Sequence, residues 1–280
     1  MSIKFNILAV SASLAMASTA MATTTTIISD TFPSTQGIGS GSYLAGSSPN
    51  VGPTGATWVT NLDGGAISST SSYQPFIGPP PDTANPATSV AIFPNAVTGD
   101  VAAAIGFTPT GNGILSLTAT LDWEGGSWLG MGFANAASTA NPSGSPGQSG
   151  PWMLITSSVQ MFGGTGSTGN FVVQGVNTRL NTVTFTYNPA TMMETLDVSN
   201  AGKGSDYLTA SVPLSHFGVT TAPTINSIYF VTRGGSTNGS NFSNVTLTQG
   251  PAQVVPEPAT FGLLGVAGAA LLLLRRRRTV

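Results

Sequence analysis

The sequence predicts an all-β protein, an antiparallel double-sheet sandwich, with an N-terminal signal helix before it and a C-terminal hydrophobic helix after it. Short runs of β-branched and aromatic residues recur between Gly, Pro and Asn, as is typical of all-β proteins. The clearest run, residues 115–124, alternates strictly between apolar and polar side chains, which predicts a strand with one face on the core. Helical spacing is almost absent from residues 23–254, so the strands must stack to bury their apolar faces.

Both ends of the chain are predicted to be export segments. Residues 1–22 combine a basic start, an apolar stretch and the small residues Ala20 and Ala22, which is the pattern of a secretory signal peptide cleaved before Thr23. A short membrane anchor is the alternative, but the small residues and the threonines that follow favour cleavage. We therefore expect a signal peptide at 1–22, a secreted β-sandwich domain at 23–252 and a sorting segment at 253–280.

The sorting segment consists of blocks that differ physically. Pro256, Glu257 and Pro258 form a rigid stretch, residues 261–274 are wholly apolar, and four arginines, Arg275, Arg276, Arg277 and Arg278, follow. A helix over 261–274 spans roughly 21 Å, against roughly 30 Å for a bilayer core, and approaches a full span when flanking residues and snorkelling arginines extend it. Arginines directly after such a helix stay on the cytoplasmic side, so the domain before it lies outside.

This order of blocks resembles the PEP-CTERM sorting signal of Gram-negative bacterial surface proteins. The resemblance covers residues 255–278 and rests on the literal Pro-Glu-Pro, the apolar run and the arginines. Together with the signal peptide it implies export through the Sec translocon, transient anchoring in the inner membrane and processing by an exosortase-type enzyme. The expected destination is the cell surface or the extracellular matrix.

The charge of the domain between the two export segments limits its partners. It keeps Arg179, Lys203 and Arg233 against nine acidic residues, a net charge of −6. Binding of nucleic acid or anionic lipid needs clustered Lys and Arg, so neither is expected. Only 6% of the chain is charged, against about 25% in a typical soluble domain, so hydroxyls and amides must form the surface. Such a surface suits contact with neutral polymers or with copies of itself.

The sequence of the domain also predicts individual strands and turns. Residues 183–187 and 191–199 form an expected hairpin around Asn188-Pro189, and one helical turn is expected at 214–217 after Pro213. The other predictions are strands at 27–32, 57–61, 88–93, 101–108, 127–134, 152–159, 171–177, 207–212, 225–233 and 242–248, and long loops at 74–85 and 136–151.

The same region carries short motifs, Asp30-Thr31-Phe32, Leu44-Ala45-Gly46, Pro49-Asn50-Val51-Gly52 and Trp58, and a later glycine-containing strand at 128–133. These motifs and the hairpin after Val183 resemble bacterial concanavalin A-like (laminin-G-like) jelly-roll domains over most of residues 27–248. The resemblance implies a concanavalin-like jelly roll, in which a concave sheet face often binds saccharides, sometimes beside a calcium ion. That family contains enzymes, lectins and inert modules, so the fold alone does not decide the activity.

Asp122 and Glu124 are the candidate catalytic pair. Residues two apart on a strand share a face about 6.7 Å apart, a separation compatible with the paired carboxylates of a glycosidase. Concanavalin-like glycosidases carry three acids as Glu-x-Asp-x-x-Glu, but Thr120 and Gly125 stand at the other acidic positions here. A solvated polar strand face explains the pair as well, so we expect no catalytic site.

The remaining enzyme classes lack their residues. His216 is the only histidine, no Gly-x-Ser-x-Gly motif is present, and the chain has no cysteine. A serine hydrolase, a thiolate enzyme and a zinc site are therefore not expected.

A structural calcium ion is the one cofactor for which the sequence leaves room. Asp82 with Asn85, or Asp63 with Asn61, could supply oxygen ligands, although turn capping by these side chains is the preferred interpretation.

Four tryptophans are candidate platforms for stacking sugar rings: Trp58, Trp123, Trp128 and Trp152. Alternation assigns Trp123 to the apolar face, and Trp152, beside the long loop at 136–151, is the better platform candidate, although a core role is the commoner one. The Asn-x-Ser/Thr triplets that begin at Asn238, Asn241 and Asn244 are expected by chance in such a composition.

We therefore expect a non-enzymatic, exported surface or matrix protein. The sorting resemblance implies association with exopolysaccharide, biofilm or floc. A carbohydrate-binding, lectin-like module is the alternative, and a glycoside hydrolase that uses Asp122 and Glu124 is a further one.

Overall fold

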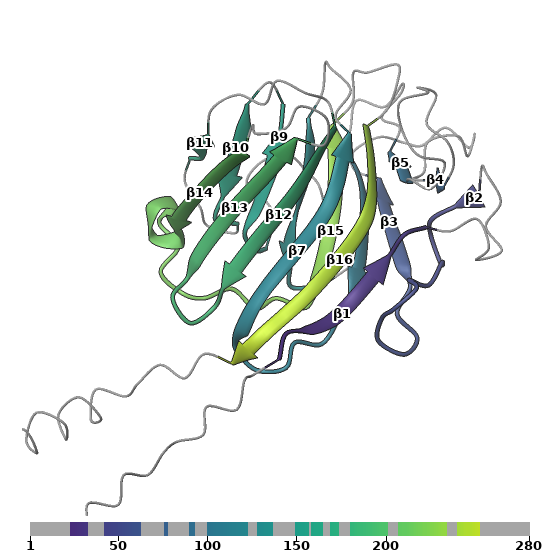
Figure 1. Cartoon of the computed structure of the whole chain (residues 1–280), viewed down its shortest axis with the longest axis horizontal. Helices are drawn as coiled ribbons and strands as arrows, with labels where there is room; N and C mark the ends of the chain where they lie inside the picture. Colours follow the sequence, from purple (N-terminus) through teal and green to yellow (C-terminus); the bar gives the residue numbers. More distant parts are fainter. Residues whose placement is uncertain are drawn as a thin grey trace, which may run out of the picture.

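The structure is a computed structural model that describes residues 23–32, 42–62, 76–77, 90–92, 100–122, 128–136, 149–156, 158–164, 169–173, 180–200, 207–233 and 240–252. Two antiparallel sheets face each other across a common core, as predicted (Figure 1). The predicted signal helix and the predicted C-terminal helix lie outside the described residues. Within these ranges, no helix is both long enough and apolar enough to cross a membrane.

The larger sheet has nine strands and occupies the front of the view in Figure 1. Its order is β14 (Tyr207–Pro213), β13 (Met193–Asn200), β12 (Leu180–Asn188), β7 (Gly113–Asp122), β16 (Ser240–Ala252), β5 (Val90–Ile92), β4 (Phe76–Ile77) and β2 (Ser42–Tyr43), with β1 (Thr25–Asp30) paired to β16.

The smaller sheet has seven strands and lies behind the first. Its order is β11 (Phe171–Val173), β10 (Val159–Phe162), β9 (Trp152–Ile155), β8 (Leu129–Ala134), β15 (Ser227–Arg233), β6 (Asp100–Gly106) and β3 (Trp58–Leu62).

Strand β7 follows the alternation that its sequence predicts. Leu117 and Leu121 are fully buried, whereas Thr118 and Thr120 on the opposite face are half-buried. The predicted hairpin is present as β12 and β13, and the Asn188 side chain accepts a hydrogen bond from the Ala190 amide at 3.0 Å, which supports the turn. Strands β12 and β13 alternate in the same way as β7.

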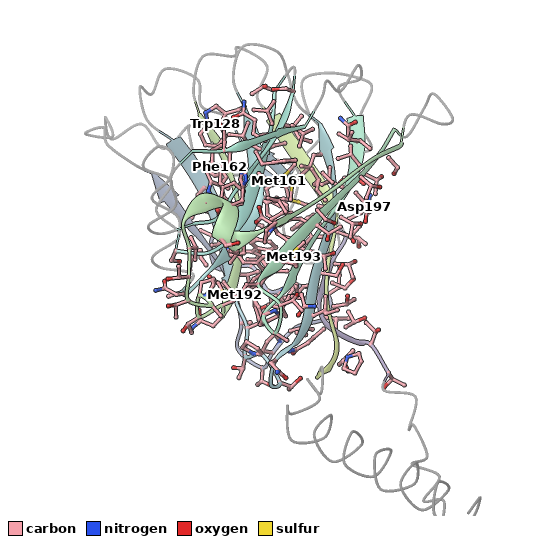
Figure 2. All side chains as sticks on the ribbon, turned by 90° about the vertical axis from the view of Figure 1, so that its left-hand side faces the viewer. Trp128, Met161, Phe162, Met192, Met193 and Asp197 are labelled. Carbon is pink, nitrogen blue, oxygen red and sulfur yellow. The ribbon has the colours of Figure 1, made fainter. Side chains whose placement is uncertain are left out.

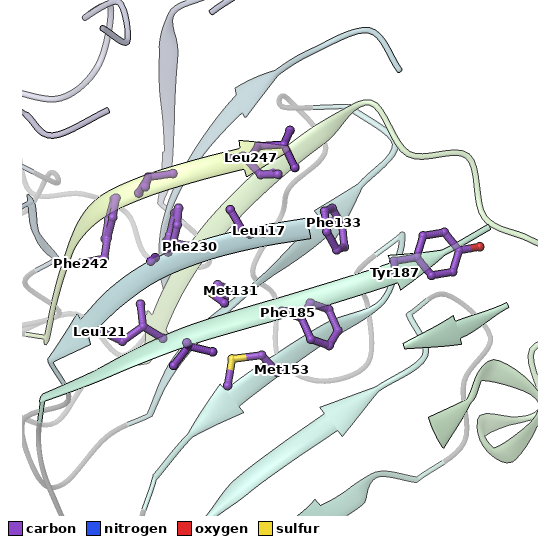
Figure 3. Close-up of a cluster of buried hydrophobic side chains, with 14 of the residues drawn as sticks. Leu117, Leu121, Met131, Phe133, Met153, Phe185, Tyr187, Phe230, Phe242 and Leu247 are labelled. Atoms are coloured by element: carbon purple, nitrogen blue, oxygen red, sulfur yellow. The ribbon is translucent and has the colours of Figure 1, made fainter. Parts of the chain in front are cut away.

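The core lies between the inner faces of the two sheets. Figure 3 shows how aromatic and aliphatic side chains from both sheets meet there. The rings of Phe230 and Phe242 stack with centroids 4.0 Å apart, and those of Phe133 and Phe185 stack at 5.8 Å. Apolar burial of this kind supplies the main driving force for folding, and it replaces disulfides in a chain that has no cysteine.

The seven-stranded sheet is buried on its outer face as well, which the sequence did not predict. We call the residues there the outer aromatic cluster: Trp152, Phe162, Tyr229, Leu154, Val231, Ala102, Ala104 and Ala134, with Trp128 and Val59 packed against them. Trp152 stacks on Phe162 at 4.4 Å and lies 5.9 Å from Trp128. All six residues of β8 are buried.

Two predicted boundaries were wrong. The single strand expected at 152–159 is two strands, β9 and β10, because a turn intervenes in which the Thr156 amide donates to the Ser158 carbonyl at 2.8 Å and the Ser158 amide to the Thr156 hydroxyl at 3.1 Å. The loop expected at 74–85 contains the short strand β4.

The predicted helical turn is correct. It is a 3₁₀ turn, η2 (Leu214–Phe217), which follows Pro213 and ends at Gly218, whose φ of 79° suits glycine. A Cβ on Gly163 would lie 2.8 Å from the Cβ of Phe217, so η2 packs closely on the chain after β10. Its residues Leu214 and Phe217 are buried in the common core, and the turn lies beside the edge strand β14.

Candidate functional site

The proposed catalytic pair is only partly within the described chain. Asp122 is the last residue of β7, where its backbone pairs with Leu180 on β12 and Asn241 on β16. Glu124 lies outside the described residues, so the structure gives no geometry for the pair.

The only histidine lies at the rim of the sandwich. His216 is exposed on η2, and its ring meets Phe171 edge-on at 5.6 Å and Phe217 at 5.1 Å. These contacts anchor the turn to the end of the smaller sheet and give the imidazole a structural role.

Most of the candidate calcium ligands lie outside the described residues. Asp63, Asp82 and Asn85 lie outside them, and Asn61 is described only as a backbone position of β3. Within the described ranges, no group of three or more His, Cys, Asp or Glu side chains could hold a metal ion.

Trp152 is buried, in agreement with the core role that is commoner for a tryptophan, and so it is not the sugar-stacking platform for which its position beside the long loop made it a candidate. Its side chain is 1% exposed, because Gly132 on the neighbouring strand β8 leaves room for it. A Cβ on Gly132 would lie 2.3 Å from the Cβ of Trp152. Trp58 is also fully buried, Trp128 is half-buried, and Trp123 lies outside the described residues.

Asp30 and Trp58, both within the quoted concanavalin-like motifs, meet in the core. One oxygen of the buried Asp30 carboxylate accepts the Trp58 indole N–H at 2.9 Å, and the other accepts the Phe32 amide at 2.8 Å. Burial raises the pKa of Asp30, and the two hydrogen bonds oppose the rise. Phe32 has a φ of 51°, and its ring lies 5.8 Å from that of Trp58. The two hydrogen bonds and this ring contact together hold the chain after β1 against Trp58.

Glu194 is a buried carboxyl group that the sequence analysis missed. It occupies an inward position of β13, in line with Leu196 and Val198, and neither of its oxygens has a hydrogen-bond partner. Burial raises the pKa of Glu194 to about 9, so the group is neutral at pH 7. Its cross-strand neighbour is Tyr187, whose pKa is raised to about 12 by burial and by Glu194. The sequence did contain a signal for this burial: Glu194 lies at alternate positions with Leu196 and Val198, so the three side chains share one face of the strand.

Of the asparagines that begin Asn-x-Ser/Thr triplets, Asn244 is described in most detail. It is exposed on β16 with a φ of 50°, and its side chain donates to the Thr120 hydroxyl at 3.4 Å. Asn241 is a backbone position of the same strand, and Asn238 lies outside the described residues.

The outer face of the nine-stranded sheet is the candidate functional surface. Its side chains are half-buried or exposed and almost all carry a hydroxyl group. We call it the hydroxyl face, and it comprises Thr26, Ser29, Ser116, Thr118, Thr120, Thr182, Thr184, Thr186, Thr195, Ser199, Thr209, Ser211, Thr246 and Thr248, with Asp197 and Asn244.

Strand register aligns the hydroxyls in rows across the sheet. One row crosses Thr209, Asp197, Thr184, Thr118 and Thr246 on β14, β13, β12, β7 and β16. The Thr118 and Thr184 hydroxyls lie 2.9 Å apart, and the Thr209 hydroxyl donates to Asp197 at 2.8 Å. The hydroxyls are therefore held in fixed positions.

A second row runs parallel to the first. It crosses Ser211, Thr195, Thr186, Ser116 and Thr248 on the same strands. The hydroxyls of Thr195 and Ser211 lie 2.8 Å apart, and those of Ser116 and Thr186 lie 3.4 Å apart. The row after it, towards the β12–β13 turn, contains the half-buried Met193 and ends the hydroxyl face.

The two outer faces of the sandwich thus differ in chemistry. Figure 2 shows Asp197 on one side, Trp128 and Phe162 on the other, and Met161 of the core between them. The hydroxyl face offers many hydrogen-bond donors and acceptors, with the Asp197 carboxylate among its described side chains, whereas the opposite face offers packed rings.

Comparison with known proteins supports both predicted resemblances. Residues 254–278 match the profile of the PEP-CTERM protein-sorting motif. Such a motif marks an exported protein. None of the curated proteins matches the chain.

Solved structures are similar in fold at low sequence identity. The VIP36 exoplasmic/lumenal domain, in a form bound to Ca²⁺ and Man2, has a TM-score of 0.52 at 10% identity and covers 83% of this chain and 90% of its own. A legume lectin-like domain from Entamoeba histolytica has a TM-score of 0.43 at 9% identity, covering 58% and 84%. Lectin II from Ulex europaeus has 0.41 at 12%, covering 69% and 92%. The chain therefore carries a PEP-CTERM protein-sorting motif on the C-terminal side of a two-sheet, concanavalin-like sandwich that is similar in fold to the VIP36 domain.

Proposed function

We propose that this chain is an exported protein that is sorted to the cell surface or matrix and binds extracellular carbohydrate there without transforming it. The observation that carries the proposal is the position of the sorting motif. It begins at residue 254, directly after β16 ends at Ala252. Because β16 pairs with β7, β1 and β5 inside the nine-stranded sheet, the sandwich itself is the cargo of the motif.

The surface chemistry of the cargo favours carbohydrate as its partner. The VIP36 domain has been solved with Ca²⁺ and Man2 bound, and this chain shares its fold. The hydroxyl face of this chain can exchange hydrogen bonds with sugar hydroxyls in both directions. The sorting resemblance implies association with exopolysaccharide, so binding within a biofilm matrix is the expected role.

A binding role without catalysis fits the described acids better than hydrolysis does. Glycosidases need two carboxyl groups on either side of a bound sugar. Glu194 is buried and neutral, and Asp30 is committed to Trp58 and Phe32. A glycosidase that uses Asp122 and Glu124 remains the alternative.

The export steps assign roles to both termini. Signal peptidase would cut after Ala22, and an exosortase-type enzyme would act near Pro256, Glu257 and Pro258. The apolar residues 261–274, with Arg275 to Arg278 as the cytoplasmic stop, would hold the precursor in the inner membrane until then. No cofactor is needed for this role, and Asp82 with Asn85, or Asp63 with Asn61, are the candidate ligands for a structural calcium ion.

Mass spectrometry and binding test the proposal together. Protein recovered from the surface of cells that produce the full chain should begin at Thr23 and end near residues 255–260. It should also cosediment with exopolysaccharide from the same cells. An intact Val280 terminus in surface material would contradict the processing, and failure to cosediment would contradict the carbohydrate binding.

A further inference from the structure

We propose that the hydroxyl face of the nine-stranded sheet is the binding surface for a neutral, polyhydroxylated polysaccharide, which lies across its rows of threonines. This inference rests on the proposed carbohydrate binding and assigns it to one surface. It thereby excludes the outer face of the seven-stranded sheet, where aromatic rings would otherwise suggest sugar stacking.

The regular spacing of the hydroxyls is the first argument. Neighbouring strands lie about 4.8 Å apart, and every second residue along a strand lies about 6.7 Å further on. Pairing of Thr184 with Thr118, and of Thr118 with Thr246, repeats this spacing over adjacent strands. A polymer with hydroxyls at every ring can meet such an array at several points at once, so weak contacts add up.

The hydrogen-bonding character of the face is the second argument. A threonine hydroxyl is one donor and up to two acceptors. In the Thr118–Thr184 pair one hydroxyl hydrogen is used between the two residues, and the second hydrogen and several lone pairs stay available. The face therefore both donates and accepts. Sugar hydroxyls do the same, whereas phosphates only accept and ammonium groups only donate.

The charge of the face selects a neutral polymer. Asp197 is the ionisable side chain among the described side chains of the hydroxyl face, and it accepts a hydrogen bond from Thr209. Asp122, described only as a backbone position, stands at the same outward parity of β7 and is also acidic. No lysine or arginine is among the residues that make up the face, so a polymer of acidic sugars would meet a carboxylate without a compensating cation.

A second copy of the chain is a poorer occupant. Protein interfaces depend on a few buried anchors, chiefly Trp, Tyr and Arg, and are depleted in serine. None of the residues defined above as the hydroxyl face is such an anchor, and Met193 lies at its border. Tyr207, which pairs with Ser199, is described only as a backbone position of β14. Stacking two such faces would remove many hydroxyls from water with little apolar burial in return.

The opposite face is less suited to a sugar. Trp152 and Phe162 stack on each other, and their exposed fractions are 1% and 6%. Both rings are thus already covered. Gly130 and Gly132 lie under Trp152, so this packing is specified by the strand sequence itself.

The test uses matched threonine variants of the exported full-length protein. One variant replaces Thr118, Thr184 and Thr246 by Val, and its control replaces Thr220, Thr221 and Thr224, which are exposed between η2 and β15, in the same way. Cosedimentation with insoluble cellulose and affinity electrophoresis in dextran measure binding to neutral polymers. We expect at least a tenfold loss of affinity in the row variant and no change in the control. Tryptophan emission and a urea midpoint report folding.

Each outcome either supports or overturns the inference. Equal binding by wild type and row variant overturns the inference while leaving the proposed function intact. No binding by wild type to its own exopolysaccharide or to either probe defeats both. A face-dependent dimer, seen by sedimentation without polymer, would assign the surface to a second copy instead and overturn the inference. If the triple variant does not fold, Thr184→Arg, which places a charged side chain in the centre of the face, must abolish binding for the inference to stand.

Discussion

In both sheets of this sandwich, successive side chains point alternately to the core and to the outer face, but the two outer faces differ in their chemistry. On the nine-stranded sheet, the central outward positions of β7, β12 and β13 are Thr, Ser and Asp197, and they are half-buried, with Ile114, Asn188 and Met193 at one end of these strands. On the seven-stranded sheet, the outward positions of β8 and β9 are Gly, Ala, Trp and Leu, and they are packed, whereas Val172 on the edge strand β11 is exposed. Alternation therefore identifies which residues point outward, but the residue types at those positions decide whether the face is a surface or a second core.

The contrast assigns stability to one side and recognition to the other. Rings that are covered contribute apolar burial, and hydroxyls that are held in rows contribute contacts to a polar partner. Variants on the two faces should therefore separate the free energy of unfolding from the affinity for polysaccharide.

The largest effect on stability is expected from the outer aromatic cluster. Trp152→Ala removes a fully packed ring and should lower the free energy of unfolding by about 3–5 kcal/mol. A sugar-stacking tryptophan on an open surface would cost far less. Urea unfolding measures the difference, and a loss below about 1 kcal/mol would mean that the ring is free for ligand.

The two faces of strand β7 should differ by a similar margin. Leu117→Ala and Leu121→Ala leave cavities in the core and should each cost about 2–5 kcal/mol. Thr118→Ala and Thr120→Ala should cost well under half of that, because mainly β-propensity is lost, on a scale of about 1 kcal/mol. Urea midpoints of the four variants test this, and equal costs on both faces would contradict a solvent-facing hydroxyl face.

Strand β13 gives the next comparison, between Glu194 inside and Asp197 outside. Burial raises the pKa of Glu194 from 4.5 to about 9, so the folded state holds the proton more tightly than the unfolded state. Stability that is present below pH 4.5 is therefore lost as the pH rises towards 9, by up to about 1.4 kcal/mol per pH unit.

Glu194→Gln should remove this slope and raise the urea midpoint above neutral pH. Asp197→Asn is the matched control on the outside of the same strand. Urea midpoints at pH 5, 7 and 8.5 measure the slope of stability against pH. An unaltered slope in Glu194→Gln would show that the Glu194 carboxyl group does not cause the pH dependence.

The smallest effect is expected at the candidate catalytic pair. Asp122→Asn with Glu124→Gln should change stability by no more than about 0.5 kcal/mol per site and should leave polysaccharide binding intact. Assays with labelled polysaccharides provide the check. A hydrolytic activity in the wild type that the folded double variant lacks would establish the glycosidase instead.

Most of the nine-stranded sheet could be predicted because it has one polar face. Residues 115–121 and 183–187 alternate with an unmistakable period of two, and both became strands in the expected orientation. Leu214–Phe217 followed from the preceding proline. The sorting motif was recognisable because its composition is independent of folding.

The rest depends on contacts that are distant in sequence. Strands β8, β9 and β6 are buried on both sides, so their polar–apolar period disappears, and the run 152–159 concealed a turn. The threonines of the hydroxyl face were visible singly, but their rows arise only when β7 lies between β12 and β16 in a particular register. The burial of Glu194 could not be predicted, because the sequence alone does not show which face of β13 packs on the core.

One pair of variants tests the central contrast most directly. Thr184→Arg places an arginine on the outer face of the nine-stranded sheet, and Val172→Arg places one on the seven-stranded sheet, at a valine that is 56% exposed on β11. Both are measured by cosedimentation of the exported protein with its own exopolysaccharide and with cellulose. Loss of binding in Thr184→Arg with wild-type binding in Val172→Arg is the predicted result. Wild-type binding in Thr184→Arg, with loss in Val172→Arg, would contradict the assignment of recognition to the hydroxyl face.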